Sequence, residues 1–163
     1  MENNNNKLEL RMYGLVNYQL SGIQKGIQFG HAVVEYGRMC QDMKNHEAHY
    51  RNWADNWKTF IILNGGTTNT NFSMDDGLPF GSMNRHLLAL REMGIIFATF
   101  HECDLGDQLT AIVFIVDERI FNKNKYPDPQ PFASADEQLL FMESIGGENN
   151  YKLREFLKQF RLA

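Results

Sequence analysis

A stripe of polar side chains at helical spacing is the first place where this sequence could do chemistry. Within residues 20–36, the amides of Gln24 and Gln28, the imidazole of His31 and the carboxyl of Glu35 recur at intervals of three or four. On a helix, such positions share one face. An amide can bind a ligand through both of its ends, and an imidazole titrates near neutral pH. His31 has two interpretations here: an acid or base in a site, or a hydrogen-bonded structural residue.

An acid and a hydroxyl follow around a predicted turn. Asp104 opens the segment Asp-Leu-Gly-Asp-Gln, and Thr110 stands at the start of the apolar run that comes next. If the turn joins a hairpin, the two side chains lie close together. A carboxylate at a strand end can orient or activate water, although Asp and Gly are also ordinary turn residues. The sequence has neither a Gly-x-Ser-x-Gly nucleophile elbow nor a Gly-x-Gly-x-x-Gly dinucleotide fingerprint.

The sequence lacks a standard set of metal ligands. The histidines of His46-Glu-Ala-His49 are three residues apart, whereas the zinc motif His-Glu-x-x-His needs four so that both share a helix face. Cys40 and Cys103 form no paired motif and predict two free thiols in a reducing compartment. We therefore expect no metal and no cofactor. Gly65-Gly-Thr-Thr68 could form a backbone nest for a phosphate, although it lacks the Gly-Lys-Ser/Thr ending of a nucleotide-triphosphate loop.

Composition is that of an ordinary globular protein. The chain has 163 residues, 43% of them hydrophobic and 22% charged, which is enough for one domain with a sizeable core. Without an apolar run of ~18 residues or a signal-peptide pattern, a cytoplasmic location and no membrane contact are expected. The net charge of −4 argues weakly against a protein that coats nucleic acid. Because the acidic excess lies in residues 66–121, any nucleic-acid surface is expected on the first helix and the C-terminal helix rather than in the middle of the chain.

Hydrophobic patterning predicts an α/β fold. Four short runs are apolar and rich in β-branched or aromatic residues, as strands are. They span residues 11–17, 58–64, 95–103 and 109–116. Amphipathic helices are expected from Ser21, a good N-cap, to about residue 43, and over residues 83–93, while 45–57 is a helix or a loop. Apolar strands alternating with helices indicate a three-layer sandwich with a four-stranded mixed sheet.

The first helix is expected to bury an apolar seam on this sheet. The seam residues recur at helical spacing and are Ile23, Ile27, Gly30 and Val34. In this arrangement the stripe with Gln28 and His31 runs beside the seam, at its border with solvent.

The chain is expected to have three segments. Residues 1–8 form a disordered lead-in, residues 9–121 the α/β domain, and residues 122–163 a linker with C-terminal helices packed on the domain. Three of the four prolines fall near the start of the last segment, as in a linker. Ser134-Ala-Asp-Glu137 then has the spacing of a capping box and predicts the start of a helix.

Taken in order, these pieces resemble one known family. A strand leads into a helix with Gln28-Phe-Gly-His31-Ala32, Trp57 precedes a buried strand, a later helix ends at Met-Gly-Ile, and Asp104-Leu-Gly precedes Thr110, which opens an apolar strand. This order is similar to that of the archaeal and eukaryotic type of peptidyl-tRNA hydrolase. It looks closest to the short, divergent members from bacteria and phages, which have Leu-Ser-x-x-Gln at the helix start. The resemblance covers about residues 9–118.

The resemblance implies hydrolysis of the ester that joins a peptidyl or aminoacyl group to the 3′ end of tRNA. Asp104 would orient or activate water, and Thr110 and Gln24 would position the ester. Lys25 would meet the phosphate backbone. Gln28 and His31 complete the substrate-binding residues. The expected partners are tRNA or a small nucleotide and, as in known relatives, a second copy of the chain in a homodimer.

One departure from the family pattern opens other hypotheses. Gln24 occupies the place of a functionally important lysine, and Lys25 cannot take it because one residue turns a side chain by ~100° around a helix. Losing one oxyanion donor can cost ~100-fold in rate. The alternative is therefore a catalytically inactive module on the same fold that binds a nucleotide, RNA or a protein. A virion or assembly component is a third possibility.

Overall fold

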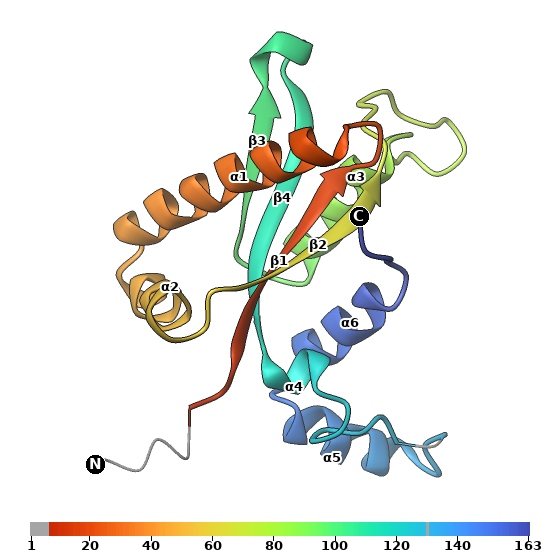
Figure 1. Ribbon diagram of the computed structural model, residues 1–163. Helices are drawn as coiled ribbons and strands as arrows, with labels where there is room; N and C mark the ends of the chain where they lie inside the picture. The colour runs from red at the N-terminus through yellow and green to blue at the C-terminus, as the bar shows by residue number, and fades with distance from the viewer. Residues whose placement is uncertain (1–6, 130) are drawn as a thin grey trace.

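A computed structural model describes residues 7–129 and 131–163, with the side chains of Lys44 and Asn45 left aside. Most of the expected lead-in therefore lies outside the described residues. Within the described part, the chain forms a mixed sheet in the order β2-β1-β4-β3, with helices on both faces (Figure 1). The strands are β1 (Leu10–Asn17), β2 (Thr59–Gly66), β3 (Phe97–Glu102) and β4 (Gln108–Asp117). This confirms the predicted α/β class and four-stranded mixed sheet.

Strand directions bring several chain ends to one edge of the sheet. β1 runs parallel to β2 and antiparallel to β4, and β4 pairs antiparallel with β3 in a hairpin. The carboxyl ends of β1, β2 and β3 therefore meet at the same end, together with the start of β4. The central strands β1 and β4 are almost entirely buried, which explains their nearly continuous apolar sequences.

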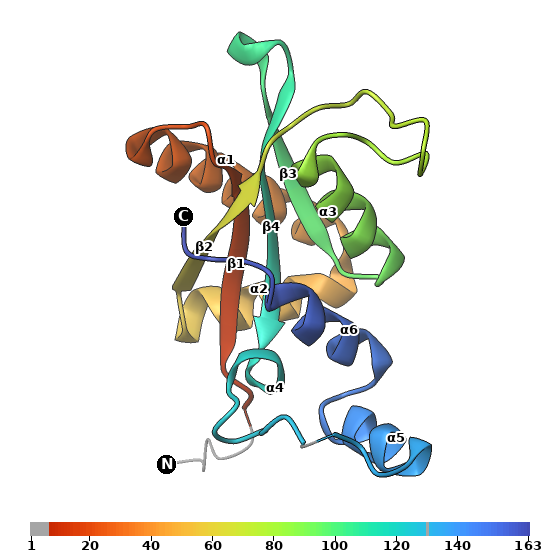
Figure 2. The same cartoon turned by 90° about the vertical axis from the view of Figure 1, so that its right-hand side faces the viewer.

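The helices and the sheet form three layers, with the sheet in the middle (Figure 2). On one face lie α1 (Gly22–Asp42) and α2 (Lys44–Asn56), and on the other lie α3 (Ser82–Glu92) and α6 (Glu148–Leu157). Each face has its own hydrophobic core. The first core includes Met12, Phe29, Tyr36, Trp53 and Val113. The second includes Leu15, Met83, Leu90, Phe114 and Leu153.

The buried face of α1 is not the predicted one. Ile23, Ile27 and Val34 are exposed, and so is Gly30. The helix instead buries Gln28, Phe29, Ala32, Tyr36, Gly37 and Cys40. Both sets have helical spacing, but aromatic rings bury more apolar surface than isoleucines do, so the face with Phe29 and Tyr36 is preferred against the sheet. The predicted apolar seam is therefore wrong.

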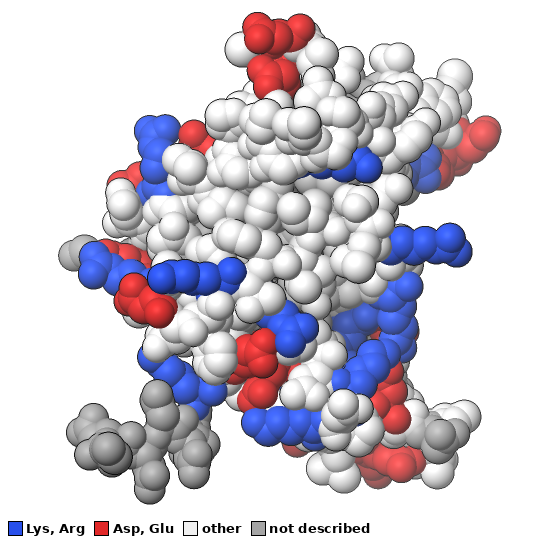
Figure 3. Space-filling model, in the orientation of Figure 1, with Lys and Arg blue, Asp and Glu red and all other residues white. Residues whose placement is uncertain are grey.

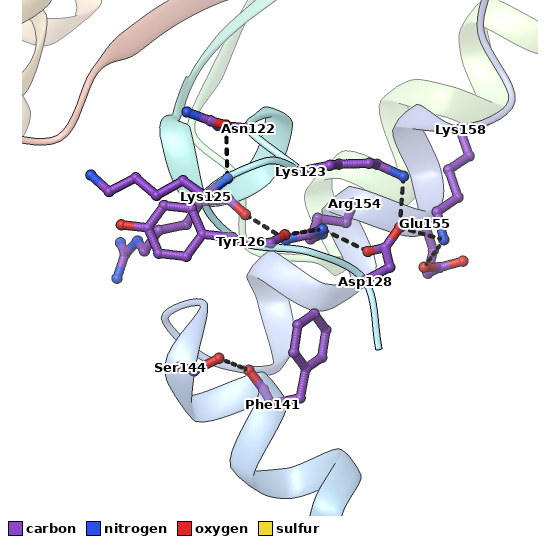
Figure 4. A network of polar contacts seen from close by, with 11 residues as sticks. Asn122, Lys123, Lys125, Tyr126, Asp128, Phe141, Ser144, Arg154, Glu155 and Lys158 are labelled. Carbon is purple, nitrogen blue, oxygen red and sulfur yellow. Dashed lines mark hydrogen bonds and ion pairs between the residues drawn. The ribbon is translucent and has the colours of Figure 1, made fainter. Parts of the chain in front are cut away.

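A buried arginine holds the C-terminal segment on the sheet domain. The side chain of Arg154 in α6 is 1% exposed. Its guanidinium donates to the carbonyl oxygens of Arg119 (2.9 Å) and Tyr126 (2.8 Å), and to the carboxylate of Asp128 (2.6 Å) (Figure 4). These partners lie in α4 (Glu118–Phe121) and in the loop after it. One buried charge thus joins α6 to two preceding segments.

The remaining C-terminal elements are α5 (Ala135–Ser144), whose N-cap is the predicted Ser134, and a short tail that extends the sheet edge. Leu162 forms a bridge with Leu63 of β2. The Asn64 amide donates to the Arg161 carbonyl (2.9 Å), and the Ala163 amide donates to the Ile62 carbonyl (3.0 Å). The tail therefore covers part of the outer edge of β2.

No described helix is long and apolar enough to cross a membrane.

Close packing of α1 on β1 yields a stability prediction. A Cβ atom at Gly14 would run into the ring of Phe29, whereas one at Gly22 would meet nothing within 4 Å. We expect Gly14→Ala to lower the free energy of unfolding by about 1–3 kcal/mol, as overpacked core substitutions do. Gly22→Ala should change it by less than about 0.5 kcal/mol. Urea unfolding of both variants checks this, and equal stabilities would contradict the packing.

A histidine of α3 that packs against aromatic rings of the C-terminal segment yields a pH prediction. The His86 ring packs edge-on against Phe156 and Phe160, and burial lowers its pKa from 6.5 to about 4. An unfolded chain takes up this proton near pH 6.5, whereas the folded protein does not until about pH 4. Protonation therefore favours unfolding as the pH falls through this window. The unfolding free energy of wild type should fall more steeply from pH 7 to pH 4.5 than that of His86→Leu, and parallel curves would refute the assignment.

Candidate functional site

A chain of hydrogen bonds joins α1 to the β3–β4 hairpin at the end of the sheet where β1, β2 and β3 finish. The Thr110 hydroxyl, 1% exposed, donates to the side-chain oxygen of Gln28 at 2.7 Å. The Gln28 Nε2 donates in turn to a carboxylate oxygen of Glu102 at 2.5 Å. The amide thus satisfies both of its ends between a hydroxyl and a carboxylate that come from opposite sides of the hairpin.

The acid in this series of hydrogen bonds is Glu102, at the end of β3. The hydrogen bond from Gln28 lowers its pKa, and the Asp104 amide, the Cys103 thiol and the charge of His31 act in the same direction. Glu102 is therefore ionised at neutral pH. Glu102 was not among the residues predicted from the sequence, where only Asp104 in the turn was considered. The signal was the same for both, since each is a carboxyl at the end of an expected strand.

Gln24 lies near Thr110, and its side chain also caps the start of α1. Its side-chain oxygen accepts from the Ser21 amide at 3.0 Å, and the Ser21 hydroxyl accepts from the Gln24 amide at 3.3 Å. This reciprocal pair is a capping box at the start of α1. The NH2 end of Gln24 keeps its donors for a ligand. Gln24 and Thr110 line one hollow of about 270 Å³, together with Asn17, Leu105 and Gln108.

Asp104 stands on the rim rather than inside this hollow. It belongs to the turn Cys103–Leu105, is exposed, and its backbone amide is 3.5 Å from the Glu102 carboxylate. The hollow is lined by the next residue, Leu105, and not by Asp104. The structure therefore brings Gln24, Gln28 and Thr110 together and places Asp104 beside them, through Glu102.

His31 and Lys25 lie on either side of this group. The exposed His31 ring stacks on Phe100 of β3 with 4.5 Å between ring centroids. This contact favours a structural role, in which His31 packs on an aromatic ring instead of forming the expected hydrogen bond. Lys25 is half-buried one residue after Gln24, on a different face of α1, and lines neither hollow at this end of the sheet.

A second, larger hollow of about 560 Å³ lies on the other side of the start of β4. Its walls are the β3–β4 hairpin around its turn, the loop after β2 and one residue of α3. They carry mainly amides, hydroxyls and an imidazole, from Thr68, Asn69, Thr70, Asn84, His101 and Gln108. Asp107 adds one carboxyl, and none of the lining residues is Lys or Arg. The Thr68 hydroxyl donates to the Leu109 carbonyl at 2.5 Å, which fixes the loop on β4.

The predicted phosphate nest is not formed. The amides of residues 65–68 would have to point outward to bind an anion. Two of them donate instead to side-chain oxygens at 2.9 Å: Gly66 to Asn64 and Thr67 to Ser82. Ser82 belongs to α3, so the spacing of residues within the predicted nest did not indicate this acceptor.

One group of metal-ligating atoms occurs among the described residues. Ligand atoms of Glu102, Cys103 and Asp104 lie within 4.8 Å of one another. All three are consecutive, two are exposed, and Glu102 already accepts from Gln28. This geometry is that of an acidic turn and does not call for an ion, so the expectation of no metal stays a prediction.

No protein-family model matches the chain, and no curated protein matches it either.

The hydrogen bond from Gln28 can be tested through the pKa of Glu102, which accepts it. Gln28→Leu removes the donor, so the pKa of Glu102 should rise toward its usual value. The control is Gln41→Leu near the far end of α1, which should leave that pKa unchanged. Carboxyl-carbon NMR titrations follow the residue directly, and an unchanged Glu102 titration in Gln28→Leu would refute the contact.

Proposed function

We propose that this chain is a peptidyl-tRNA-hydrolase-like protein of the cytoplasm that cleaves the ester at the tRNA 3′ end. The observation that carries the proposal is the Glu102–Gln28–Thr110 chain of hydrogen bonds. Gln28 and Thr110 are 82 residues apart and were both singled out from the sequence, and they meet in a direct 2.7 Å contact beside a hollow. Open α/β sheets commonly bind ligands at the carboxyl ends of their strands, and this hollow lies at that end.

The residues suggest how the step would run. A water molecule at the rim attacks the ester carbonyl carbon while the Asp104 carboxylate accepts its proton. The carbon–oxygen bond to the ribose then breaks, and the 3′-oxygen takes up a proton as it leaves. The NH2 group of Gln24 donates to the developing oxyanion, Gln28 holds Thr110 in place, and Lys25 meets phosphate. Since Gln24 is neutral, this stabilisation is weaker than an ammonium would provide.

A second candidate is a non-catalytic module that binds a nucleotide, RNA or a protein. The acidic rim favours it. Glu102, Asp104 and Asp107 lie at the end of β3 and in the turn that follows, acidic side chains gather at the tip of the hairpin (Figure 3), and neither hollow is lined by a cation. A phosphate backbone would be repelled there. An uncharged nucleoside moiety or a protein segment fits this end of the sheet better. Recruitment into an assembly, such as a virion, is a variant of the same proposal.

Hydrolysis of labelled peptidyl-tRNA separates the two candidates. Wild type should release the peptide, and Asp104→Ala should lose at least about 100-fold in rate, as general-base variants do. Gln24→Lys, which adds the cation, should raise the rate by about 10-fold or more. Asp75→Ala, an acid in the loop after β2, is the control and should match wild type.

Two outcomes would contradict the proposed hydrolase activity. One is absence of turnover by wild type and by Gln24→Lys at stoichiometric protein; the other is equal rates for wild type and Asp104→Ala. Calorimetry with tRNA and nucleotides then tests the second candidate. Saturable binding without turnover supports a non-catalytic binding module, and absence of binding excludes nucleotides and RNA as its ligands.

A further inference from the structure

The larger hollow lies outside the proposed hydrolysis site, because none of the residues given a role in that reaction lines it. The β3–β4 hairpin and the loop after β2, which form its walls, rise from the same end of the sheet (Figure 2). Its volume of about 560 Å³ falls within the ~300–1,000 Å³ that is typical of small-molecule sites. Gln108 lines both hollows, so the two adjoin.

The wall formed by the loop after β2 and by α3 is fixed as a set of hydrogen-bond donors. The side-chain oxygen of Asn84 accepts from the Asn69 amide, and that of Asn69 accepts from the Asn71 amide, both at 3.0 Å. A backbone donor therefore sets which end of each side-chain amide is the acceptor. The NH2 groups of Asn69 and Asn84 make no hydrogen bond within the described part of the chain, so both can donate to a ligand.

A glycine holds the two asparagines of this wall together. The Gly81 amide donates to the Asn69 carbonyl at 3.0 Å and closes the loop. A Cβ atom at Gly81 would collide with the Asn69 nitrogen and would stand 2.6 Å from the side-chain oxygen of Asn84. A larger residue would push the two amides apart. The donors are thus preformed, which lowers the entropic cost of binding a ligand.

The wall formed by the hairpin carries an acceptor. Asp107 has a φ of 60°, in the left-handed region that residues other than glycine adopt at a cost. Its amide donates to the Glu102 carbonyl at 3.0 Å, which fixes the backbone of the turn. Its carboxylate, which can only accept, forms no hydrogen bond and no ion pair with the described residues. The hollow therefore offers donors on one wall and an unpaired acceptor on the other.

His101 supplies the one ring among the lining residues. Phe100 stacks on His31 of α1, so the next residue of β3 points to the opposite face of the sheet, where the hollow lies. Imidazole rings, like other aromatic side chains, stack on nucleobases. A flat ligand with donors on one edge and acceptors on another fits between these groups.

We propose that the larger hollow binds the guanine base of a free nucleoside. Guanine carries a ring N–H next to an exocyclic amino group, and these two donors match the two oxygens of the Asp107 carboxylate. Its carbonyl oxygen and the neighbouring ring nitrogen accept from the NH2 groups of Asn69 and Asn84. Adenine, cytosine and uracil lack this pair of adjacent donors. An arginine side chain would also pair with Asp107, but it has no acceptor and leaves both asparagine amides without a partner.

Charge favours a nucleoside over its phosphates. None of the lining residues is Lys or Arg, and Asp107 lies in the same turn as Asp104, next to Glu102 at the end of β3. A phosphate on the ribose would be repelled by these carboxylates. Because the second candidate function already expects an uncharged nucleoside at this end of the sheet, the proposal rests on that candidate and needs neither ester hydrolysis nor tRNA.

Two-dimensional NMR titrations with nucleosides test the site. Guanosine should shift the side-chain NH2 signals of Asn69 and Asn84 but not that of Gln24, with a dissociation constant of about 100 µM. Inosine, which lacks the exocyclic amino group, should bind at least about tenfold more weakly, because it leaves one carboxylate oxygen unpaired. GMP, which carries the phosphate of a nucleotide or of RNA, should bind about threefold or more weakly than guanosine. N-acetylarginine amide should cause no shift.

Several results of these titrations would overturn the proposal. They are the absence of shifts with 1 mM guanosine, equal binding of inosine, tighter binding of GMP, and shifts confined to the smaller hollow. Preferential binding of another nucleoside would refute guanine and leave the second candidate function standing. Hydrolysis of peptidyl-tRNA is measured separately, so either proposal can fail alone.

A substitution of Asp107 tests the specificity through a gain as well as a loss. Asp107→Asn keeps the size of the side chain, and asparagine also tolerates the left-handed conformation. The variant should bind guanosine at least about tenfold more weakly. It should instead prefer xanthosine, whose carbonyl replaces the amino group and accepts from the new amide. Asp75→Asn, an exposed acid that does not line the hollow, is the control and should match wild type. An unchanged preference for guanosine in Asp107→Asn would overturn the contact.

Discussion

A buried amide needs a partner at each end, and Gln28 finds them on the two strands of one hairpin. This requirement fixes the rotation of α1 about its axis and its height above the sheet. With Gln28 between Glu102 and Thr110, the aromatic face of the helix lies on β1 and the isoleucines point to solvent. The hollow beside Thr110, the stacking of His31 and the exposure of the isoleucines all follow from that one placement.

The C-terminal segment uses the same principle at the opposite end of the sheet. The terminal nitrogens of the buried Arg154 donate to two backbone carbonyls and one carboxylate of α4 and the loop after it. Its Nε is buried without a hydrogen-bond partner among the described residues. The loop, α6 and the tail on β2 therefore form one support for the second face of the sheet. This support lies far from the hollows, which explains why the extension adds no side chain to them.

Sequence patterns were sufficient for the strands and the helix ends, because two-sided burial and capping act locally. They failed on the face of α1, since Ile23 and Phe29 both belong to sets with helical spacing and only the sheet distinguishes them. They found Gln28 and Thr110 but not Glu102, because hydrogen bonds between distant segments leave no mark on spacing. The phosphate nest failed for the same reason, because the Thr67 amide donates to the Ser82 hydroxyl of α3.

The order of the strands has a consequence for folding kinetics. The β3–β4 hairpin is local, whereas β1 pairs with β4 across about a hundred residues, from Leu10 to Asp117. Closing that loop is the slow, entropically costly step. Both partners of Gln28 belong to the hairpin, so α1 cannot take its final orientation until the hairpin exists. The hollow with Thr110 and the central strand pair are therefore completed together, late in folding.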